Sequence, residues 1–333
     1  MAAGWYLTKG ELSVFHIDLD HYWAHFNYVF SDACHKRTTY KFGFIKSLID
    51  CLYSAVSSDR GMELTYDMVF SKFTENYWNL IAKYEISQII PDGMSNKSMI
   101  EKMIYQIRDR QVAVKELDFE TLGTEDQKDL SNKVKIECRK NVIGALYIDF
   151  KGELYGFSHA EETIWLHKCA YQFLMMYKLE VERMNYYAWA KFLDKINKNH
   201  PQTQLLEKLE LATPKRKNLS PFRDLLRTEF ESNNCFYCGS KLGSKIHVDH
   251  VIPWSFVKSD HLWNFVLACP KCNIQKKDLL PSKYKLAEVT MRNQKLGEII
   301  NPFLKRELVG YSDELMWKIW DYAVKQGYKI CPK

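Results

Sequence analysis

Two pairs of cysteines, each with a two-residue spacer, constrain this chain more than any other feature. Cys235 and Cys238 form the first pair, and Cys269 and Cys272 form the second. A two-residue spacer lets both thiolates of a pair reach one tetrahedral Zn²⁺ ion. The 30 residues between the pairs exceed the roughly 15–20 residues usual between such pairs. A sizeable insertion must therefore fold between two metal knuckles.

A structural zinc ion is the preferred interpretation of these four cysteines, against two disulfides or an iron site of the rubredoxin type. A zinc ion closed by four thiolates has no open coordination position, so its role would be folding and not catalysis. The other five of the nine cysteines are scattered without metal-like spacing. No secretory leader is recognisable at the N-terminus, so we expect a reduced, cytoplasmic protein.

The insertion reads as two short strands followed by a helix. Residues 246–252 are rich in β-branched residues and alternate, which is typical of a strand, and Pro253 ends it. Asn264 precedes a second apolar run. Cys272 leads into a short helix on which Asn273 and Lys276 share a face. The pattern predicts a compact ββα unit held at its base by zinc.

The string D-H-V-I-P-x-S-F, then an asparagine, then C-x-x-C-N-x-x-K, resembles the HNH endonucleases of the ββα-metal (His-Me finger) class. It is most similar to the variant with a four-cysteine zinc site. The resemblance covers about residues 235–281. The part from Asp249 to Asn273 is also similar to the target-strand nuclease domain of RNA-guided CRISPR effectors, which lacks those cysteines.

The resemblance implies a role for each matched residue. His250 would be the general base, Asp249 and Asn273 would bind Mg²⁺ or Mn²⁺, and Asn264 would tie the loop. Each also has a structural alternative: a neutral core histidine for His250, a turn cap for Asp249, and a helix N-cap for Asn273. His247 and Lys276 could contact a phosphate, although Lys276 is as easily a plain surface charge.

These residue types suit hydrolysis of a phosphodiester bond. Histidine titrates near neutral pH and can deprotonate a water molecule. A hard cation on oxygen ligands stabilises the charge that develops on the leaving oxygen. The sequence around Asp249 offers too few carboxylates for two metal ions. A one-metal mechanism follows, and the resemblance implies products with a 5′-phosphate and a 3′-hydroxyl.

The net charge of +6 is unevenly distributed along the chain. Residues 1–200 carry 25 Lys and Arg against 27 Asp and Glu, whereas residues 201–333 carry 22 against 14. A basic C-terminal half favours a polyanionic partner. We expect DNA, preferably double-stranded, with RNA as the open alternative. No apolar run reaches 18–20 residues, so no membrane span is expected.

The predicted fold is mainly α-helical and α+β overall. A helical domain over 1–205 would serve targeting, regulation or dimerisation, and the nuclease domain would span 206–333. Within the first domain, a β-hairpin is expected near 145–157 around Lys151-Gly152. Apolar periodicity predicts a helix over 66–84 and further helices over 282–299 and 312–327. Ser158 and Glu161 resemble a capping box that opens a helix running toward Pro201.

One N-terminal cluster carries metal-ligand residue types. His16, Asp18, Asp20, His21 and His25 fall within ten residues, and His21 and His25 have helical i,i+4 spacing. Such a pair can hold a metal ion. A helix N-terminus capped by Asp20, with partly buried histidines, explains the same pattern without a metal.

The sequence therefore predicts a metal-dependent HNH endonuclease acting on DNA, in bacterial restriction or anti-phage defence. Its further expected partners are a second copy of the chain and a defence-system protein. A zinc-stapled module that binds nucleic acid without cutting it is one alternative. The other is a nuclease effector that stays silent until a partner or ligand activates it.

Overall fold

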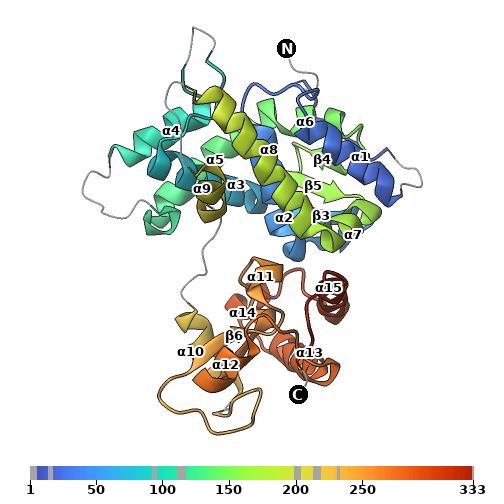
Figure 1. Cartoon of the computed structure of the whole chain (residues 1–333), viewed down its shortest axis with the longest axis vertical. Helices are drawn as coiled ribbons and strands as arrows, with labels where there is room; N and C mark the ends of the chain where they lie inside the picture. The colour runs from blue at the N-terminus through green and yellow to red at the C-terminus, as the bar shows by residue number, and fades with distance from the viewer. Residues whose placement is uncertain are drawn as a thin grey trace. The chain divides into compact units, whose positions relative to one another are not determined.

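The chain forms two compact units in the computed structural model, unit 1 over Met1–Lys215 and unit 2 over Arg216–Lys333 (Figure 1). The structure describes residues 6–13, 18–91, 96–110, 118–198, 204–212, 219–230 and 233–331. Helices dominate both units and each also contains a small antiparallel sheet, so the predicted mainly helical α+β class is confirmed. The units divide ten residues beyond the expected boundary at 205/206.

The sheet of unit 1 has five strands in the order β1-β4-β5-β3-β2, and every neighbouring pair is antiparallel. The four residues of β5 are all buried, and β5 pairs on both sides. The strands are β1 (Lys9–Gly10), β2 (Val56–Ser58), β3 (Gly61–Thr65), β4 (Tyr155–Ser158) and β5 (Thr163–Leu166).

The hairpin expected near 145–157 lies further along the chain, between β4 and β5. Residues 145–149 belong to helix α6 (Ile143–Asp149). Lys151 and Gly152 have positive φ angles of 52° and 71°, a backbone conformation that ends a helix as readily as it turns a hairpin. Ser158 and Glu161 likewise cap a turn, because the Ser158 hydroxyl accepts a hydrogen bond from the Glu161 N–H inside the β4–β5 connection.

The helices of unit 1 cover this sheet and form most of the core. The predicted helix over 66–84 is confirmed as α3, and its N-cap is Thr65, whose hydroxyl accepts the Met68 N–H. Gly43 lets α2 approach α3 closely, because a Cβ there would lie 2.2 Å from the Tyr77 ring. The helices are α1 (Leu19–Phe30), α2 (Tyr40–Cys51), α3 (Tyr66–Tyr84), α4 (Met99–Arg108), α5 (Thr124–Asn141), α6, α7 (Lys168–Met176), α8 (Lys178–Ile196) and α9 (Leu205–Ala212), with 3₁₀ turns η1 (Leu52–Ser54) and η2 (Phe119–Thr121).

A buried ion-pair network joins α2 to α8 within this core. The Lys46 ammonium contacts Asp50 one turn away and lies 3.1 Å from Glu182 Oε1 on α8. All three side chains are less than 10% exposed. Burial opposes the charge of Lys46, but the acidic neighbours, led by Asp50, outweigh it and raise the pKa of the lysine. Lys46 therefore stays charged, and its contact with Glu182 joins α2 to α8.

Unit 2 is built around the short antiparallel hairpin β6–β7 and the helix α12 that follows it. The helices expected over 282–299 and 312–327 are present as α13 and α15. The elements are α10 (Ser220–Phe230), β6 (His247–His250), α11 (Trp254–Val257), the 3₁₀ turn η3 (Leu262–Asn264), β7 (Phe265–Ala268), α12 (Pro270–Lys276), α13 (Lys283–Glu298), α14 (Pro302–Glu307) and α15 (Asp313–Lys325).

Helix α13 fixes the start of β7 through two polar side chains. The Arg292 guanidinium donates to the carbonyls of Phe265 and Trp263, and the Asn293 amide donates to Trp263 O at 2.8 Å. Burial lowers the pKa of Arg292 to about 10. The C-terminal segment closes the unit, since Trp320 Nε1 donates to Pro281 O at 2.9 Å. Helix α13 thus holds the start of β7 and α15 closes the unit, and the sequence predicted both helices.

No helix in the described part of the chain combines the length and the apolarity needed to cross a lipid bilayer.

Candidate active site

The four cysteines converge although two of them lie 30 residues from the others. Cys235 and Cys238 lie in the loop before β6, whereas Cys269 caps α12 and Cys272 lies in its first turn. Their sulfur atoms all lie within 4.8 Å of one another, and none is in a disulfide. Tetrahedral Zn²⁺ with Zn–S bonds of about 2.3 Å separates its sulfurs by roughly 3.8 Å. The cluster fits a structural zinc ion.

Backbone groups orient the cluster. The Cys269 N–H donates to Cys235 Sγ at 3.3 Å, and Gly239 turns the first knuckle with a φ of +70°. Hydrogen bonds from Ser240 lower the pKa of Cys238 to about 6, whereas burial raises the pKa of Cys272. A bound cation would favour the thiolate form of all four cysteines.

Strand β6 presents alternate side chains to opposite faces. His250 pairs with Phe265 across the hairpin and Asp249 pairs with Val266. His247 and Asp249 face α12, since both contact side chains of that helix. The His250 ring lies instead against the edge of the Phe265 ring, with centroids 4.8 Å apart. The predicted base and the predicted metal ligands therefore leave the strand on different sides.

One oxygen of Asp249 is held by two partners. The Tyr237 hydroxyl donates to Asp249 Oδ2 at 2.5 Å, and the Lys276 ammonium lies 3.2 Å from the same oxygen. Burial and the carboxylate raise the pKa of Tyr237, so the phenol stays protonated and donates. Within residues 233–331, no hydrogen bond or ion pair to Asp249 Oδ1 was found. The carboxylate is thus anchored by Oδ2, with Oδ1 able to bind a cation.

Lys276 does not lie on the surface, where a plain surface charge would be. Its side chain is 4% exposed and its ammonium donates to His250 O at 2.6 Å. Burial lowers the pKa of Lys276, an effect that the nearby Asp249 carboxylate partly offsets. Lys276 therefore binds the end of β6 to α12, and it is the charge partner of Asp249.

Asn273 and His247 are brought together across the same face. The Asn273 Nδ2 group lies 3.0 Å from His247 Nδ1, so the amide donates to an unprotonated ring nitrogen. This contact consumes the amide nitrogen and leaves Asn273 Oδ1 as the acceptor. Asp249 and Asn273 thus repeat one arrangement, in which one polar atom is fixed and an oxygen remains for a hard cation.

His250 has a partner that the sequence did not reveal. Its Nε2 atom lies 2.8 Å from Asp260 Oδ1, and the two side chains are 7% and 6% exposed. Within residues 233–331, the ring makes no hydrogen bond to Asp249 or Asn273. Asp260 lies in the loop between α11 and η3, a place where an aspartate ordinarily faces solvent. Only the fold identifies it as part of the site.

Asn264 holds the loop together and is fully buried. Its Oδ1 accepts the Ile252 N–H at 2.8 Å and its Nδ2 donates to Ile252 O at 2.9 Å. Its own carbonyl accepts the Val251 N–H at 2.8 Å. Three hydrogen bonds therefore fix the turn that follows His250 to the start of β7.

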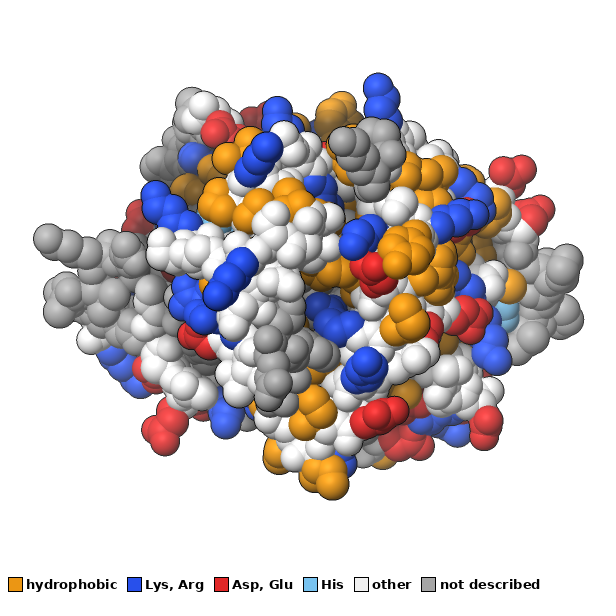
Figure 2. All heavy atoms as spheres, turned by 90° about the horizontal axis from the view of Figure 1, so that it is seen from below, with side chains coloured by type: hydrophobic (Ala, Val, Ile, Leu, Met, Phe, Trp, Pro, Cys, Tyr) orange, Lys and Arg blue, Asp and Glu red, His pale blue; other side chains and the backbone are white. Residues whose placement is uncertain are grey.

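Positively and negatively charged side chains are mixed on the face of the molecule that Figure 2 shows. Lys and Arg side chains lie interspersed with Asp and Glu on the face drawn in Figure 2, with apolar side chains between them.

A zinc-stapled β-hairpin followed by a helix, with histidine, aspartate and asparagine at their junction, is the architecture of the ββα-metal nucleases. Residues 235–279 match the family described as HNH endonuclease. Comparison with curated proteins and with solved structures gave no match. The match supports a nuclease-type function and the binding of nucleic acid, and it agrees with the resemblance predicted from the sequence.

Proposed function

We propose that unit 2 is a divalent-metal-dependent endonuclease that hydrolyses DNA phosphodiester bonds with His250 as the general base. The observation that carries the proposal is the paired arrangement of Asp249 and Asn273. Each has one polar atom engaged by a neighbour and one oxygen left to accept a cation. Two oxygen donors leave most positions of Mg²⁺ or Mn²⁺ for water and phosphate, as Mg²⁺ prefers.

Asp260 sets the state of the base. A carboxylate oxygen only accepts, so the Nε2 atom of His250 at 2.8 Å carries the proton. In the neutral form of this ring, Nδ1 carries a lone pair and can take a proton from an attacking water molecule. The cation would stabilise the charge that develops on the leaving oxygen. Asn264 fixes the turn after His250 and so maintains the position of the ring.

Double-stranded DNA is the proposed substrate, cut or nicked to leave a 5′-phosphate and a 3′-hydroxyl, as HNH enzymes commonly do. We place the activity in restriction or anti-phage defence, with unit 1 selecting the target or regulating cleavage. Cutting both strands at once, with one such site per chain, would take two copies of the chain.

A nuclease assay on supercoiled plasmid tests the proposal. Wild-type protein should nick or linearise the plasmid with Mg²⁺ or Mn²⁺ and stop with EDTA. His250→Ala and Asp249→Ala should lose at least about 100-fold in rate, the lower end of what a general base supplies. Asp321→Asn is the matched control, because Asp321 is 54% exposed on α15 and pairs with Lys325. Full activity of folded His250→Ala protein would refute the assignment of the base.

One observation favours a second function, in which the unit binds nucleic acid without cutting it. The Lys276 ammonium already neutralises Asp249, as it would in a site that holds no metal ion. In that case wild-type protein would retard duplex DNA equally with EDTA and with Mg²⁺, and the plasmid would stay intact. An effector that needs an activating partner would also leave the plasmid intact, but it would cleave once the partner is supplied.

A further inference from the structure

Unit 1 contains a second cluster of metal-ligand side chains, separate from the nuclease site. His21 and His25 lie one turn apart on α1, and Glu153 follows the turn between α6 and β4. The sequence separates Glu153 from His21 by 132 residues, and the fold brings it to both rings. His16, the other histidine of the N-terminal cluster, lies outside the described residues.

The three donor atoms point at one place. The Nε2 atoms of His21 and His25 lie 3.1 Å apart, and Glu153 Oε2 contacts both. Both rings can donate an Nε2–H to this carboxylate oxygen. The same convergence lets the two unprotonated ring nitrogens and the oxygen direct three lone pairs at one cation. The 3.1 Å between the two ring nitrogens is a separation found between ligands on a small ion.

The three side chains are partly buried, and hydrogen bonds hold the two segments that carry them. The side chain of His25 is 7% exposed, that of Glu153 is 21% exposed and that of His21 is 44% exposed. Asp18 caps α1 by accepting the His21 N–H at 2.8 Å. The turn before Glu153 is held by Ser13, whose hydroxyl donates to Lys151 O at 3.0 Å. The donors are therefore positioned before any ion arrives, with one side open to solvent.

We propose that His21, His25 and Glu153 bind a divalent first-row transition metal, with Zn²⁺ as the reference ion. Two imidazoles and one carboxylate are borderline donors that suit such ions better than Mg²⁺ or Ca²⁺. Three protein ligands leave at least one position for water or an incoming donor group. The site thus differs in kind from the closed four-thiolate cluster, and it does not depend on the nuclease activity of unit 2.

Metal content of the full-length chain tests the proposal. Protein dialysed against metal-free buffer, then loaded with Zn²⁺ and desalted, should hold two zinc ions per chain by elemental analysis. His25→Ala should hold one. His35→Ala is the matched control, because His35 is exposed outside the cluster, and it should keep two. One ion in wild-type protein, unchanged by His25→Ala, would mean that the cluster binds a proton only and would overturn the proposal.

Cobalt substitution separates the two sites directly. Four thiolates on Co²⁺ give intense sulfur-to-metal charge transfer in the near ultraviolet, and nitrogen and oxygen donors do not. His25→Ala should leave that charge transfer intact and remove the weaker visible bands of the second ion. Glu153→Gln keeps the shape of the side chain and should bind Zn²⁺ at least 100-fold more weakly, above the 10–100-fold cost of losing an outer partner. A folded Glu153→Gln protein that binds Zn²⁺ as tightly as wild type would also contradict the proposal.

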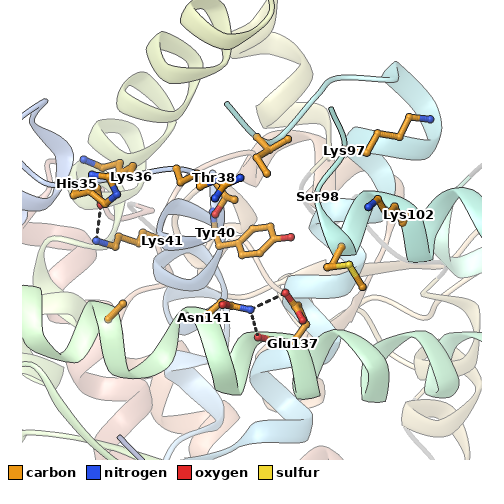
Figure 3. A pocket seen from close by; sticks show the side chains of 14 residues that line it. His35, Lys36, Thr38, Tyr40, Lys41, Lys97, Ser98, Lys102, Glu137 and Asn141 are labelled. Carbon is orange, nitrogen blue, oxygen red and sulfur yellow. Dashed lines mark hydrogen bonds between the residues drawn. The ribbon is translucent and has the colours of Figure 1, made fainter. Parts of the chain in front are cut away.

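A different observation points to a second ligand site in unit 1. A cavity of about 750 Å³ lies between the N-terminal part of α2, the start of α4 and the end of α5. Figure 3 shows its cations in two groups on either side of Tyr40, with Lys36 and Lys41 on one side and Lys97 and Lys102 on the other. Arg37 also lines it, and Glu137 is the acidic side chain of the lining.

Lys36 and Lys41, the cations of one group, have different kinds of partner. Lys41 pairs with Asp149 at 2.6 Å, and Glu137 binds the Asn141 amide at 2.6 Å. Among the described residues, the hydrogen bonds of the Lys36 ammonium go to the backbone carbonyls of Ser31 and Cys34, at 2.7 and 3.1 Å. Burial lowers the pKa of Lys36, and the neighbouring Lys41 adds to that effect. An anion entering between the two groups would relieve this repulsion.

We infer that this cavity binds a phosphorylated small molecule of nucleotide size. Its volume lies within the roughly 300–1,000 Å³ usual for such sites. Apolar lining from Ile89, Met99 and Ala145 would cover an uncharged moiety while the lysines bind phosphate. The occupant would then be positioned to regulate or direct the chain, which is the role expected for this part of the molecule.

Calorimetry on the full chain, with ADP and pyrophosphate as probes and adenosine as the uncharged control, tests this inference. ADP or pyrophosphate should bind and adenosine should not. The Lys36→Met, Lys102→Met double variant should weaken binding at least 10-fold. Lys133→Met, on the exposed side of α5 where Lys133 pairs with Asp129, should change nothing. Failure of both phosphate probes, or equal binding by the double variant, would overturn it.

Discussion

The two units are stabilised in different ways. Unit 1 buries a large aromatic core, in which Phe73 and Tyr77 stack at 4.3 Å, and it also contains a buried ion pair. The core around the ββα hairpin is small, and one of its members is the zinc ligand Cys235, which is 1% exposed. A small core needs a cross-link or a metal ion, whereas a large one does not. The stability of unit 2 should therefore depend on a bound metal ion, whereas unit 1 should fold without one.

The two metal-ligand clusters differ in the same way. The cysteine cluster lies inside the core of unit 2 and ties two loops together. The His21–His25–Glu153 cluster lies at the rim of a unit whose core forms without it. The first should therefore determine folding, and the second should add a ligand to a fold that already exists.

The largest expected effect is that of Cys235→Ser. Structural zinc contributes about 10–16 kcal/mol to small zinc domains, so its loss should unfold unit 2 while unit 1 stays folded. Zinc content and limited proteolysis followed by mass spectrometry measure this. We expect a resistant fragment near residues 1–215 and rapid cleavage beyond it. If unit 2 of the variant kept both its zinc ion and its resistance to proteolysis, the expected dependence of unit 2 on zinc would be wrong.

The next effect concerns unit 1. Lys46→Ala leaves Asp50 and Glu182 buried without their cation and should cost about 3–5 kcal/mol of unfolding free energy. The triple variant Lys46→Met, Asp50→Leu, Glu182→Leu should recover most of that loss, because apolar residues often replace a buried ion pair at little cost. Chemical denaturation followed by circular dichroism tests both. A Lys46→Ala variant as stable as wild type would show that the pair is not structural.

The features that the sequence predicted correctly are those that short sequence patterns specify. Cysteine spacing predicted the zinc cluster, and apolar periodicity predicted α3, because neither depends on distant parts of the chain. The two strands and the helix of the HNH segment followed from alternation, Pro253 and a family resemblance. Asp249 and His250 could be named for the same reason, although their opposite orientations could not be.

What the sequence missed depends on tertiary structure. Asp260 is ten residues from His250, in a loop with no periodicity, and nothing local distinguishes it from a surface aspartate. Glu153 reaches His21 and His25 only because the turn after α6 returns the chain to α1. The Lys151-Gly152 turn was assigned to a hairpin because its residues also suit the end of a helix.

Asp260→Asn tests a contact found only in the structure. An asparagine can keep the geometry but can present an amide nitrogen to His250 Nε2, which favours the wrong tautomer. We expect the cleavage rate to fall about 10–100-fold, as for other outer partners of an active site. A shift in the pH profile of cleavage would accompany the loss, and Asp260→Glu should restore part of the rate. A rate equal to that of wild type, with the same pH profile, would show that Asp260 is structural alone.

The smallest effect distinguishes two roles for Lys276, as a competitor of the metal ion for Asp249 or as a phosphate contact. Lys276→Met removes the ammonium 3.2 Å from Asp249 Oδ2 and keeps an apolar stem of similar length. If the lysine competes with the catalytic cation for Asp249, the Mg²⁺ concentration at half-maximal cleavage should fall a few-fold. If it contacts phosphate instead, the KM for DNA should rise and the Mg²⁺ dependence should stay unchanged. An enzyme that needs Asp249 for metal must show the first result, because a carboxylate relieved of one cation binds another more readily.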